Sequence, residues 1–225
     1  IPGYEYDIFI SYRQKDNKGD HWVSSFVQTL KDELDAALKE ELNIYFDSNP
    51  HDGLHEMHDV NGSLKEKIKC LIFIPILSRT YCDPNSFAWQ HEFLAFRDFA
   101  SGDSFGLKVK LSNGNLASRV LPVRIHELST EDTFLFEKET GGPIRAIDFV
   151  FKSAGVNRPL LPTDKREENL AHSVYRDQVN KLANVIGDIV AAIKKPLQAP
   201  SAQVQESHQA TSKSSRKKIF FSVIG

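Results

Sequence analysis

The sequence predicts an α/β fold in which helices cover both faces of a parallel sheet. Three apolar runs, at 6–12, 42–46 and 70–77, are dense in β-branched and aromatic residues, as buried strands are. Between the first two runs, apolar residues recur at steps of three and four over 22–42, which is the spacing of an amphipathic helix. A strand, a helix and a strand in this order form a βαβ unit, so the sheet should be parallel.

The pattern then repeats along the first half of the chain. Asp20 is the expected N-cap of the first helix. A polar loop over 47–62 leads into a short helix at 63–69, which precedes the third strand. After that strand, residues 83–86 (DPNS) supply the start signals of a further helix.

The second half of the chain contains an excursion, two strands and a last helix. Asn113-Gly114 is a strong turn signal and predicts a hairpin near 107–118. We expect a fourth strand at 119–125 and a fifth at 144–151, where apolar and polar residues alternate. Apolar residues at helical spacing predict a last helix that Pro196 stops: Leu182, Val185, Ile186, Ile189 and Ile193.

The chain of 225 residues, 40% of them hydrophobic, is long enough to bury a sizeable core, and residues 1–195 are expected to form one domain. The composition of 196–215 is that of a flexible linker. A basic cluster at 213–218 then runs into an apolar segment, so 216–225 is either the start of a transmembrane helix or a disordered tail. We expect a cytoplasmic domain, with the alternative of a membrane anchor through a segment beyond residue 218.

Composition excludes several classes of function. The 28 Lys and Arg against 30 Asp and Glu leave a net charge of -2, which indicates no nucleic-acid partner. The two cysteines, Cys70 and Cys82, form no CxxC pair, which fits a reducing compartment and excludes a disulfide scaffold or a thiolate zinc site. No glycine-rich phosphate loop follows a predicted strand. The third strand also ends without the aspartate that a phospho-acceptor receiver needs.

A metal site is an alternative for the polar loop. Residues 51–59 hold three histidines and three acids, a density that suggests zinc or manganese. Gly53 and the absence of apolar periodicity place this cluster on a loop, and its segment 55-HEMHD-59 lacks the helical i, i+4 histidine pair of a zincin. We therefore expect a solvated loop and no metal.

An acid on an apolar helix face marks the candidate site. At about 100° per residue, five apolar residues share one face: Trp89, Phe93, Phe96, Phe99 and Ala100. Glu92 lies between Phe96 and Phe99 on this face. Burying an unpaired carboxylate costs on the order of several kcal/mol, so Glu92 must be paired, near the rim or in a cleft. Its helix follows the third strand, and Tyr12-Arg13 follow the first at the same sheet edge, where open α/β sheets bind ligands.

The segments around this edge resemble the Toll/interleukin-1 receptor (TIR) domain in its prokaryotic form. The resemblance covers residues 5 to about 195 and rests on four segments in order: 7-DIFISYR-13, 44-IYFD-47, 73-FIPILSRTY-81 and the helix with Trp89 and Glu92. It implies a flavodoxin-like domain with a central five-stranded parallel sheet. Some TIR domains are adaptors that act only by TIR–TIR association. Others, including many bacterial ones, cleave NAD at the nicotinamide glycosidic bond with a glutamate on this helix.

The resemblance implies an NAD glycohydrolase that self-association activates, an effector in bacterial defence, with a non-catalytic interaction module as the alternative. Glu92 matches the catalytic glutamate, and NAD is the substrate rather than a bound cofactor. Tyr12 and Arg13 would line the nucleotide pocket, and Ser78 would lie at its mouth. Trp89 would contact the substrate, but it lies three residues before Glu92 rather than the usual four, so core packing is the alternative.

The long loop at 47–62 corresponds to the association loop of the family. That loop packs against a neighbouring domain and can complete the pocket from outside. The residues expected to make this contact are Asp47, His51, Asp52, Gly53, His55 and His58. The expected partners are therefore NAD and other TIR domains in a homo-oligomer.

Overall fold

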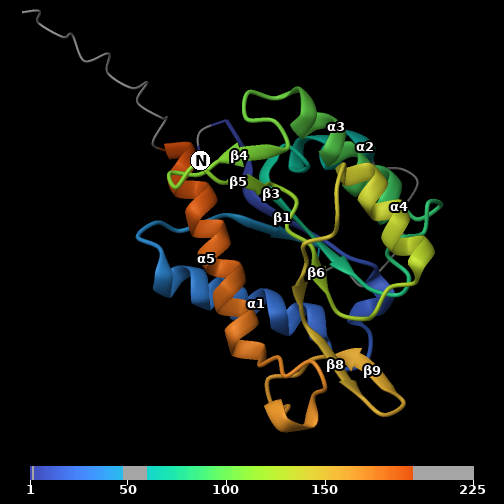
Figure 1. The fold of residues 1–225 in the computed structure, drawn as a ribbon. Coiled ribbons are helices and arrows are strands. Elements are labelled where there is room, and N and C mark those ends of the chain that lie inside the picture. The colour runs from blue at the N-terminus through green and yellow to red at the C-terminus, as the bar shows by residue number, and fades with distance from the viewer. Residues whose placement is uncertain (2, 48–59, 195–225) are drawn as a thin grey trace, which may run out of the picture.

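A five-stranded parallel sheet forms the centre of the molecule (Figure 1). The computed structural model describes residues 1, 3–47 and 60–194. The strands of this sheet are β1 (Tyr6–Ser11), β2 (Ile44–Phe46), β3 (Cys70–Leu77), β6 (Val123–Arg124) and β7 (Ile147–Asp148). Their order is β2-β1-β3-β6-β7, and every neighbouring pair is parallel. Counted along the chain this is 2-1-3-4-5, the flavodoxin-like order, so the predicted fold class is confirmed.

Helices cover the sheet on both sides (Figure 1). The first side is covered by α1 (Trp22–Ala37) and α5 (Tyr175–Lys194). The second side is covered by α2 (Val60–Lys67), α3 (Leu94–Gly102), which continues a π-helix at Ala88–Phe93, and α4 (Thr130–Thr140). Apolar strands with no polar alternation are therefore buried on both faces, as parallel sheets are.

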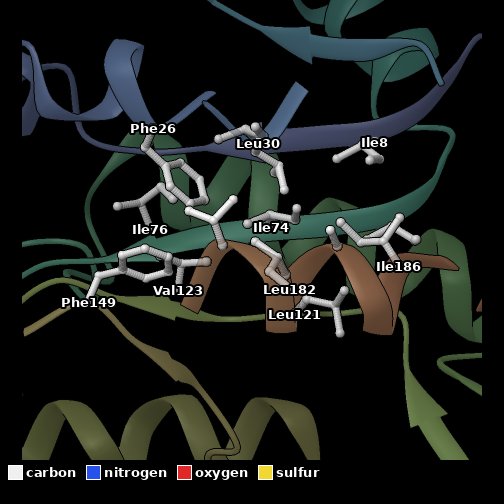
Figure 2. Close-up of a cluster of buried hydrophobic side chains, with 14 of the residues drawn as sticks. Ile8, Phe26, Leu30, Ile74, Ile76, Leu121, Val123, Phe149, Leu182 and Ile186 are labelled. Atoms are coloured by element: carbon white, nitrogen blue, oxygen red, sulfur yellow. The ribbon is translucent and has the colours of Figure 1, made fainter. Parts of the chain in front are cut away.

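Successive strand residues feed two separate cores because strand side chains alternate between faces. Ile8 and Ile10 join the cluster under α1 and α5, which Figure 2 shows. On the other face of the sheet, Phe9 and Phe73 stack with their ring centroids 5.5 Å apart, in the cluster that also contains Phe96. The sheet therefore holds its helices by burying apolar side chains on two sides at once.

Two antiparallel hairpins extend from this framework. β4 (Lys108–Lys110) and β5 (Leu116–Ser118) pair around the Asn113-Gly114 turn, where Gly114 has a φ of 86°. The predicted fifth strand within 144–151 is confirmed as β7, but it is shorter than expected because the chain leaves the central sheet after Asp148. β8 (Val150–Ser153) instead pairs with β9 (Val156–Pro159) through a turn in which Gly155 has a φ of 73°. The apolar alternation continued into β8 and hid the change of partner.

The helix boundaries also differ from the sequence pattern. The first helix ends at Ala37, and His21, with a φ of 53°, precedes it. The expected cap Asp20 accepts the Trp22 N–H at 3.3 Å. The sequence analysis missed α4, in which Phe136 is the buried residue. The end signals of α4 were nevertheless present, since Ser129 accepts an N–H at its start and Gly141 follows its end.

Short 3₁₀ turns lie at Gln14–Asn17 (η1) and Arg166–Glu168 (η3). In the part of the chain that the structure describes, no helix is both long and apolar enough to span a bilayer. The predicted linker at 196–215 and the apolar segment at 216–225 lie outside the described residues.

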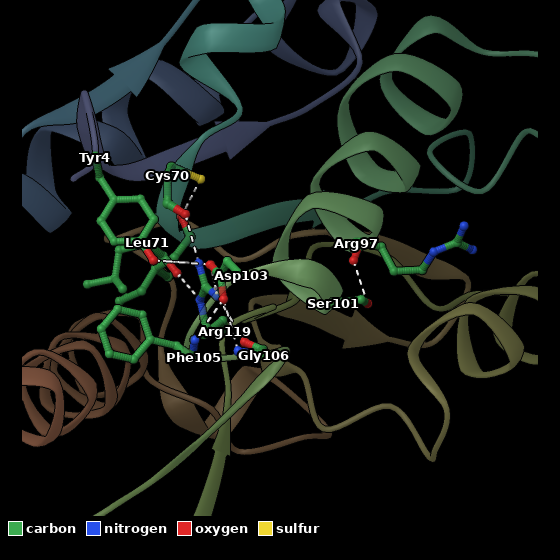
Figure 3. Close-up of polar contacts among 10 residues, drawn as sticks. Tyr4, Cys70, Leu71, Arg97, Ser101, Asp103, Phe105, Gly106 and Arg119 are labelled. Atoms are coloured by element: carbon green, nitrogen blue, oxygen red, sulfur yellow. Dashed lines mark hydrogen bonds and ion pairs between the residues drawn. The ribbon is translucent and has the colours of Figure 1, made fainter. Parts of the chain in front are cut away.

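A fully buried arginine joins three parts of the second side (Figure 3). The Arg119 guanidinium donates to the carbonyl oxygens of Leu71 at 2.7 Å and of Cys70 at 3.1 Å, at the start of β3. It also donates to Asp103 Oδ2 at 2.6 Å and to Gly106 O at 2.8 Å, in the chain after α3. Since the charge is paired and its donors are used, the site stabilises the fold only as long as all partners are present.

Arg119→Met should therefore destabilise the domain by about 3–5 kcal/mol, because it leaves Asp103 and three carbonyls without their buried partner. Urea unfolding followed by circular dichroism measures this difference. Arg176→Met is the matched control: Arg176 pairs with Glu33 but is 74% exposed, so its loss should cost at most about 1 kcal/mol. Equal costs for the two variants would show that the Arg119 network is not a structural anchor.

Candidate active site

The site lies where the chain turns in opposite directions after two neighbouring strands. After β1 the chain leads to α1 on one side of the sheet, and after β3 it leads to the π-helix and α3 on the other. β1 and β3 are adjacent and parallel. Such a switch point opens a crevice at the carboxyl ends of the strands, where open α/β sheets bind ligands.

Glu92 lies on a π-helix, η2 (Ala88–Phe93), rather than on the regular helix that the sequence analysis assumed. Ser86 Oγ accepts the Trp89 N–H at 3.2 Å near the start of this segment. A π-helix has more residues per turn than an α-helix, so the expected place of Glu92 between Phe96 and Phe99 was derived from the wrong geometry. The altered turn directs Glu92 toward the end of β1. π-Helical turns are rare and frequently occur at functional sites.

The Glu92 carboxylate is held by a hydroxyl from β1. Ser11 Oγ donates to Glu92 Oε2 at 2.5 Å, and the Tyr81 hydroxyl lies 2.7 Å from the same Ser11 oxygen. Burial raises the pKa of Glu92 to about 7, the charge of Asp47 adds to the rise, and the Ser11 hydrogen bond opposes it. The carboxyl group therefore exchanges its proton near neutral pH, unlike an ordinary glutamate.

Arg13 lies at the same edge, directly after β1. Its Nη1 is 3.6 Å from Asp83 Oδ2, close enough for an ion pair but too far for a hydrogen bond. Within the described residues, this buried Nη1 has no hydrogen-bond partner. A guanidinium with an unused donor is suited to a phosphate or a ribose hydroxyl, in keeping with the role expected for Arg13.

Two further predicted pocket residues, Tyr12 and Ser78, are covered by their own chain. Tyr12 is 7% exposed, stacks on Phe46 at 5.2 Å and donates to the Asp47 carbonyl at 2.6 Å. Ser78 is 1% exposed and accepts the Thr80 N–H at 3.2 Å. These are the positions of a packed aromatic residue and a strand-end cap.

Trp89 lies in the core rather than at a ligand-binding face. Its side chain is 2% exposed, and its ring centroid lies 4.8 Å from that of Phe93 and 6.3 Å from that of Phe136. The one-residue difference in its spacing from Glu92 is consistent with this placement. Of the two alternatives for Trp89, substrate contact and core packing, its position in the structure is that of a core residue.

Asp47 is the one expected association-loop residue whose position is described, at the end of β2. His51, Asp52, Gly53, His55 and His58 lie outside the described residues. Within residues 1, 3–47 and 60–194 no group of three His, Cys, Asp or Glu is placed to hold a metal ion. The histidine cluster that suggested a metal remains outside that range.

The sequence analysis missed three polar residues at this edge. Ser11 and Tyr81 are fully buried next to Glu92, and a serine inside the apolar run of β1 was the signal that could have identified the first. Asp16 lies on η1, and its Oδ2 has no hydrogen-bond partner among the described residues. Burial raises the pKa of Asp16, while the Ser78 hydroxyl and nearby basic groups oppose the rise. The edge therefore combines acids, a base and hydroxyls.

No protein-family model and no curated protein matches this chain. Among solved structures, it is similar to the TIR domains in the structure of the activated Roq1 resistosome directly recognizing the pathogen effector XopQ. The likeness has a TM-score of 0.37 and 15% sequence identity, and it covers 84% of this chain and 96% of that chain. Support for a function comes from this chain's own site.

The raised pKa of Glu92 makes the stability of the protein depend on pH. The folded state binds the Glu92 proton more tightly than the unfolded state does, so protonated Glu92 adds to the free energy of unfolding. This stabilisation is complete below the usual pKa of 4.5 and is lost as pH rises through about 7. The parent should therefore lose about 2 kcal/mol of stability between pH 5 and pH 8 that Glu92→Gln, which has no carboxyl group at this position, does not lose. Urea unfolding at the two pH values measures this change.

Glu127→Gln is the control, because it should leave the change in stability between pH 5 and pH 8 the same as in the parent. The pKa of Glu127 is lowered, chiefly by the hydrogen bond from Lys152, so its contribution is lost as pH falls rather than as it rises. If the Glu92→Gln and parent stabilities stayed parallel from pH 5 to pH 8, the shifted pKa would be disproved.

Proposed function

We propose that this chain is a TIR-type NAD glycohydrolase that cleaves the bond between nicotinamide and ribose, with Glu92 as the catalytic carboxylate. The observation that carries the proposal is the Glu92 side chain itself. It is partly buried on a π-helix at the switch point of the sheet, and a buried hydroxyl orients it. No structural ion pair accounts for it within the described residues.

The chemistry of the bond suits one carboxylate. When the glycosidic bond breaks, its electron pair leaves with nicotinamide, which departs as a neutral molecule and needs no general acid. The ribose carbon develops oxocarbenium character, which a nearby carboxylate can stabilise or trap, as in glycosidases. Water then supplies the oxygen of the product sugar and releases a proton. Glu92 can perform this role only in its ionised form.

Arg13 supports the choice of substrate class. NAD carries a diphosphate and two riboses. The Nη1 atom of Arg13, which has no hydrogen-bond partner among the described residues, lies at the same edge of the sheet as Glu92. Tyr12 would then act indirectly, since its hydrogen bond to the Asp47 carbonyl joins the end of β1 to the end of β2. In this proposal Arg13 binds the nucleotide, and Tyr12 supports the pocket.

We further propose that self-association activates the enzyme and that it acts as an effector in bacterial defence. The loop at 47–62 would make the association contact, and its first residue, Asp47, contributes to the raised pKa of Glu92. A change at this loop would thereby reach the catalytic group. The alternative, an interaction module without catalysis, is favoured by large apolar side chains left exposed, such as Phe134 at 69% and Phe87 at 46%.

Nicotinamide release tests the proposal directly. Protein clustered on vesicles through an added tag is incubated with NAD, and nicotinamide is quantified by liquid chromatography. Glu92→Gln should lower the rate by about 100-fold or more, because the transition-state charge loses its partner. Glu66→Gln, an exposed glutamate on α2, is the matched control and should retain the parent rate. No release from the clustered parent would favour the adaptor, and equal release from parent and Glu92→Gln would remove Glu92 from the mechanism.

The pH profile supplies a second test. Because the carboxylate form is the active one and the pKa of Glu92 is about 7, the rate at low NAD should rise with pH through about 7 and level off above it. Stopped assays between pH 5.5 and 9 measure this profile. A rate that falls with rising pH in this window would indicate a general acid instead.

A further inference from the structure

We propose that Ser11 and Tyr81 are positioning residues that form a two-hydroxyl relay, which holds the Glu92 side chain and favours its ionised form. This inference rests on the proposed function for its consequence in catalysis, but its physical content concerns only the three side chains. The relay runs from the Tyr81 hydroxyl through Ser11 Oγ to Glu92 Oε2. It joins the turn after β3, the end of β1 and the π-helix.

The proton count gives the relay a direction. A serine hydroxyl has one proton to donate and lone pairs to accept with. Ser11 gives its proton to the carboxylate at 2.5 Å, a length typical of a bond to a charged oxygen. The Tyr81 hydroxyl, 2.7 Å away, must then donate to Ser11. Each donor strengthens the next, because a hydroxyl that accepts a hydrogen bond becomes a better donor.

Burial keeps Tyr81 in the donor state. Tyr81 is fully buried, and within the described residues Ser11 is its hydrogen-bond partner. Burial, with the charge of Glu92 as a smaller cause, raises the pKa of the Tyr81 phenol well above its usual value. The phenol therefore keeps its proton throughout the pH range of the enzyme and cannot reverse the relay. The ring centroids of Tyr81 and Trp89 are 6.4 Å apart in an edge-on contact. This packing holds the Tyr81 hydroxyl in place.

Two other titratable groups face the same carboxyl. Asp47, at the end of β2, repels the charged form and acts against the relay. Tyr45 on β2 is also near enough to interact with the charge of Glu92, and burial raises its pKa to about 12. Its hydroxyl accepts from Lys67 Nζ at 3.3 Å and is not part of the relay. Tyr45 therefore offers a matched control for Tyr81.

The experiment compares Ser11→Ala and Tyr81→Phe with the parent, and Tyr45→Phe is the control. The proton affinity of Glu92 is measured by ¹³C NMR of protein labelled at the glutamate carboxyl carbon, with the Glu92 signal assigned by its absence in Glu92→Gln. Tyr81→Phe removes one oxygen atom and keeps the ring, so the core packing is retained. The titration does not require NAD, so it remains informative even if the protein cleaves no NAD.

The relay predicts that the Glu92 titration moves to higher pH by about one unit in Ser11→Ala, and by a smaller amount in the same direction in Tyr81→Phe. Tyr45→Phe should leave it unchanged. In the nicotinamide assay the rising limb of the pH profile should move by the same amounts, while Tyr81→Phe keeps most of the rate at pH 9. An unchanged Glu92 titration in either relay variant, or an equal shift in Tyr45→Phe, would overturn the relay.

Discussion

The parallel pairing of β1 with β3 is the constraint on which the other elements depend. Its register sets Ile8 beside Ile72, Phe9 beside Phe73 and Ile10 beside Ile74. Since strand side chains alternate, one face of this pair supports α1 and α5, and the other supports α2, α3 and α4. The same register ends with Ser11 beside Pro75, so a hydroxyl stands at the edge where the two connections separate. The framework and the site thus share one set of strand contacts.

The candidate site shows how a partly buried acid is kept in an apolar setting. Burial disfavours the charge of Glu92, and one hydrogen bond from Ser11 offsets part of that cost. A stronger partner, such as an arginine, would lower the pKa and keep the carboxylate permanently ionised. Arg119 shows the contrasting solution, since its charge is paired with Asp103 and its donors reach three carbonyls. The first arrangement leaves a group that can react, and the second leaves a structural anchor.

Predictions from the sequence succeeded where the signal was local and strong. The apolar runs of β1 and β3 and the C-terminal end of α5 were recognised within about two residues of their observed ends. The weaker α4 was missed because Phe136 is its buried residue, so little apolar periodicity is present. The sequence analysis joined β8 to β7 because alternation does not reveal a change of partner strand. Trp89 lies in the core with Phe93, as its place on the apolar face of the helix predicted.

The sequence by itself determined the alternation of strands and helices in the first half of the chain, the burial of the sheet on both faces and the presence of an unusual acid at position 92. These follow from periodicity, which short stretches of chain carry. Only the tertiary structure decided which groups meet that acid. Ser11 lies 81 residues from Glu92, and Tyr81 lies 70 residues from Ser11. Their contact depends on strand register and on the angle of one π-helical turn, and neither is encoded in a local pattern.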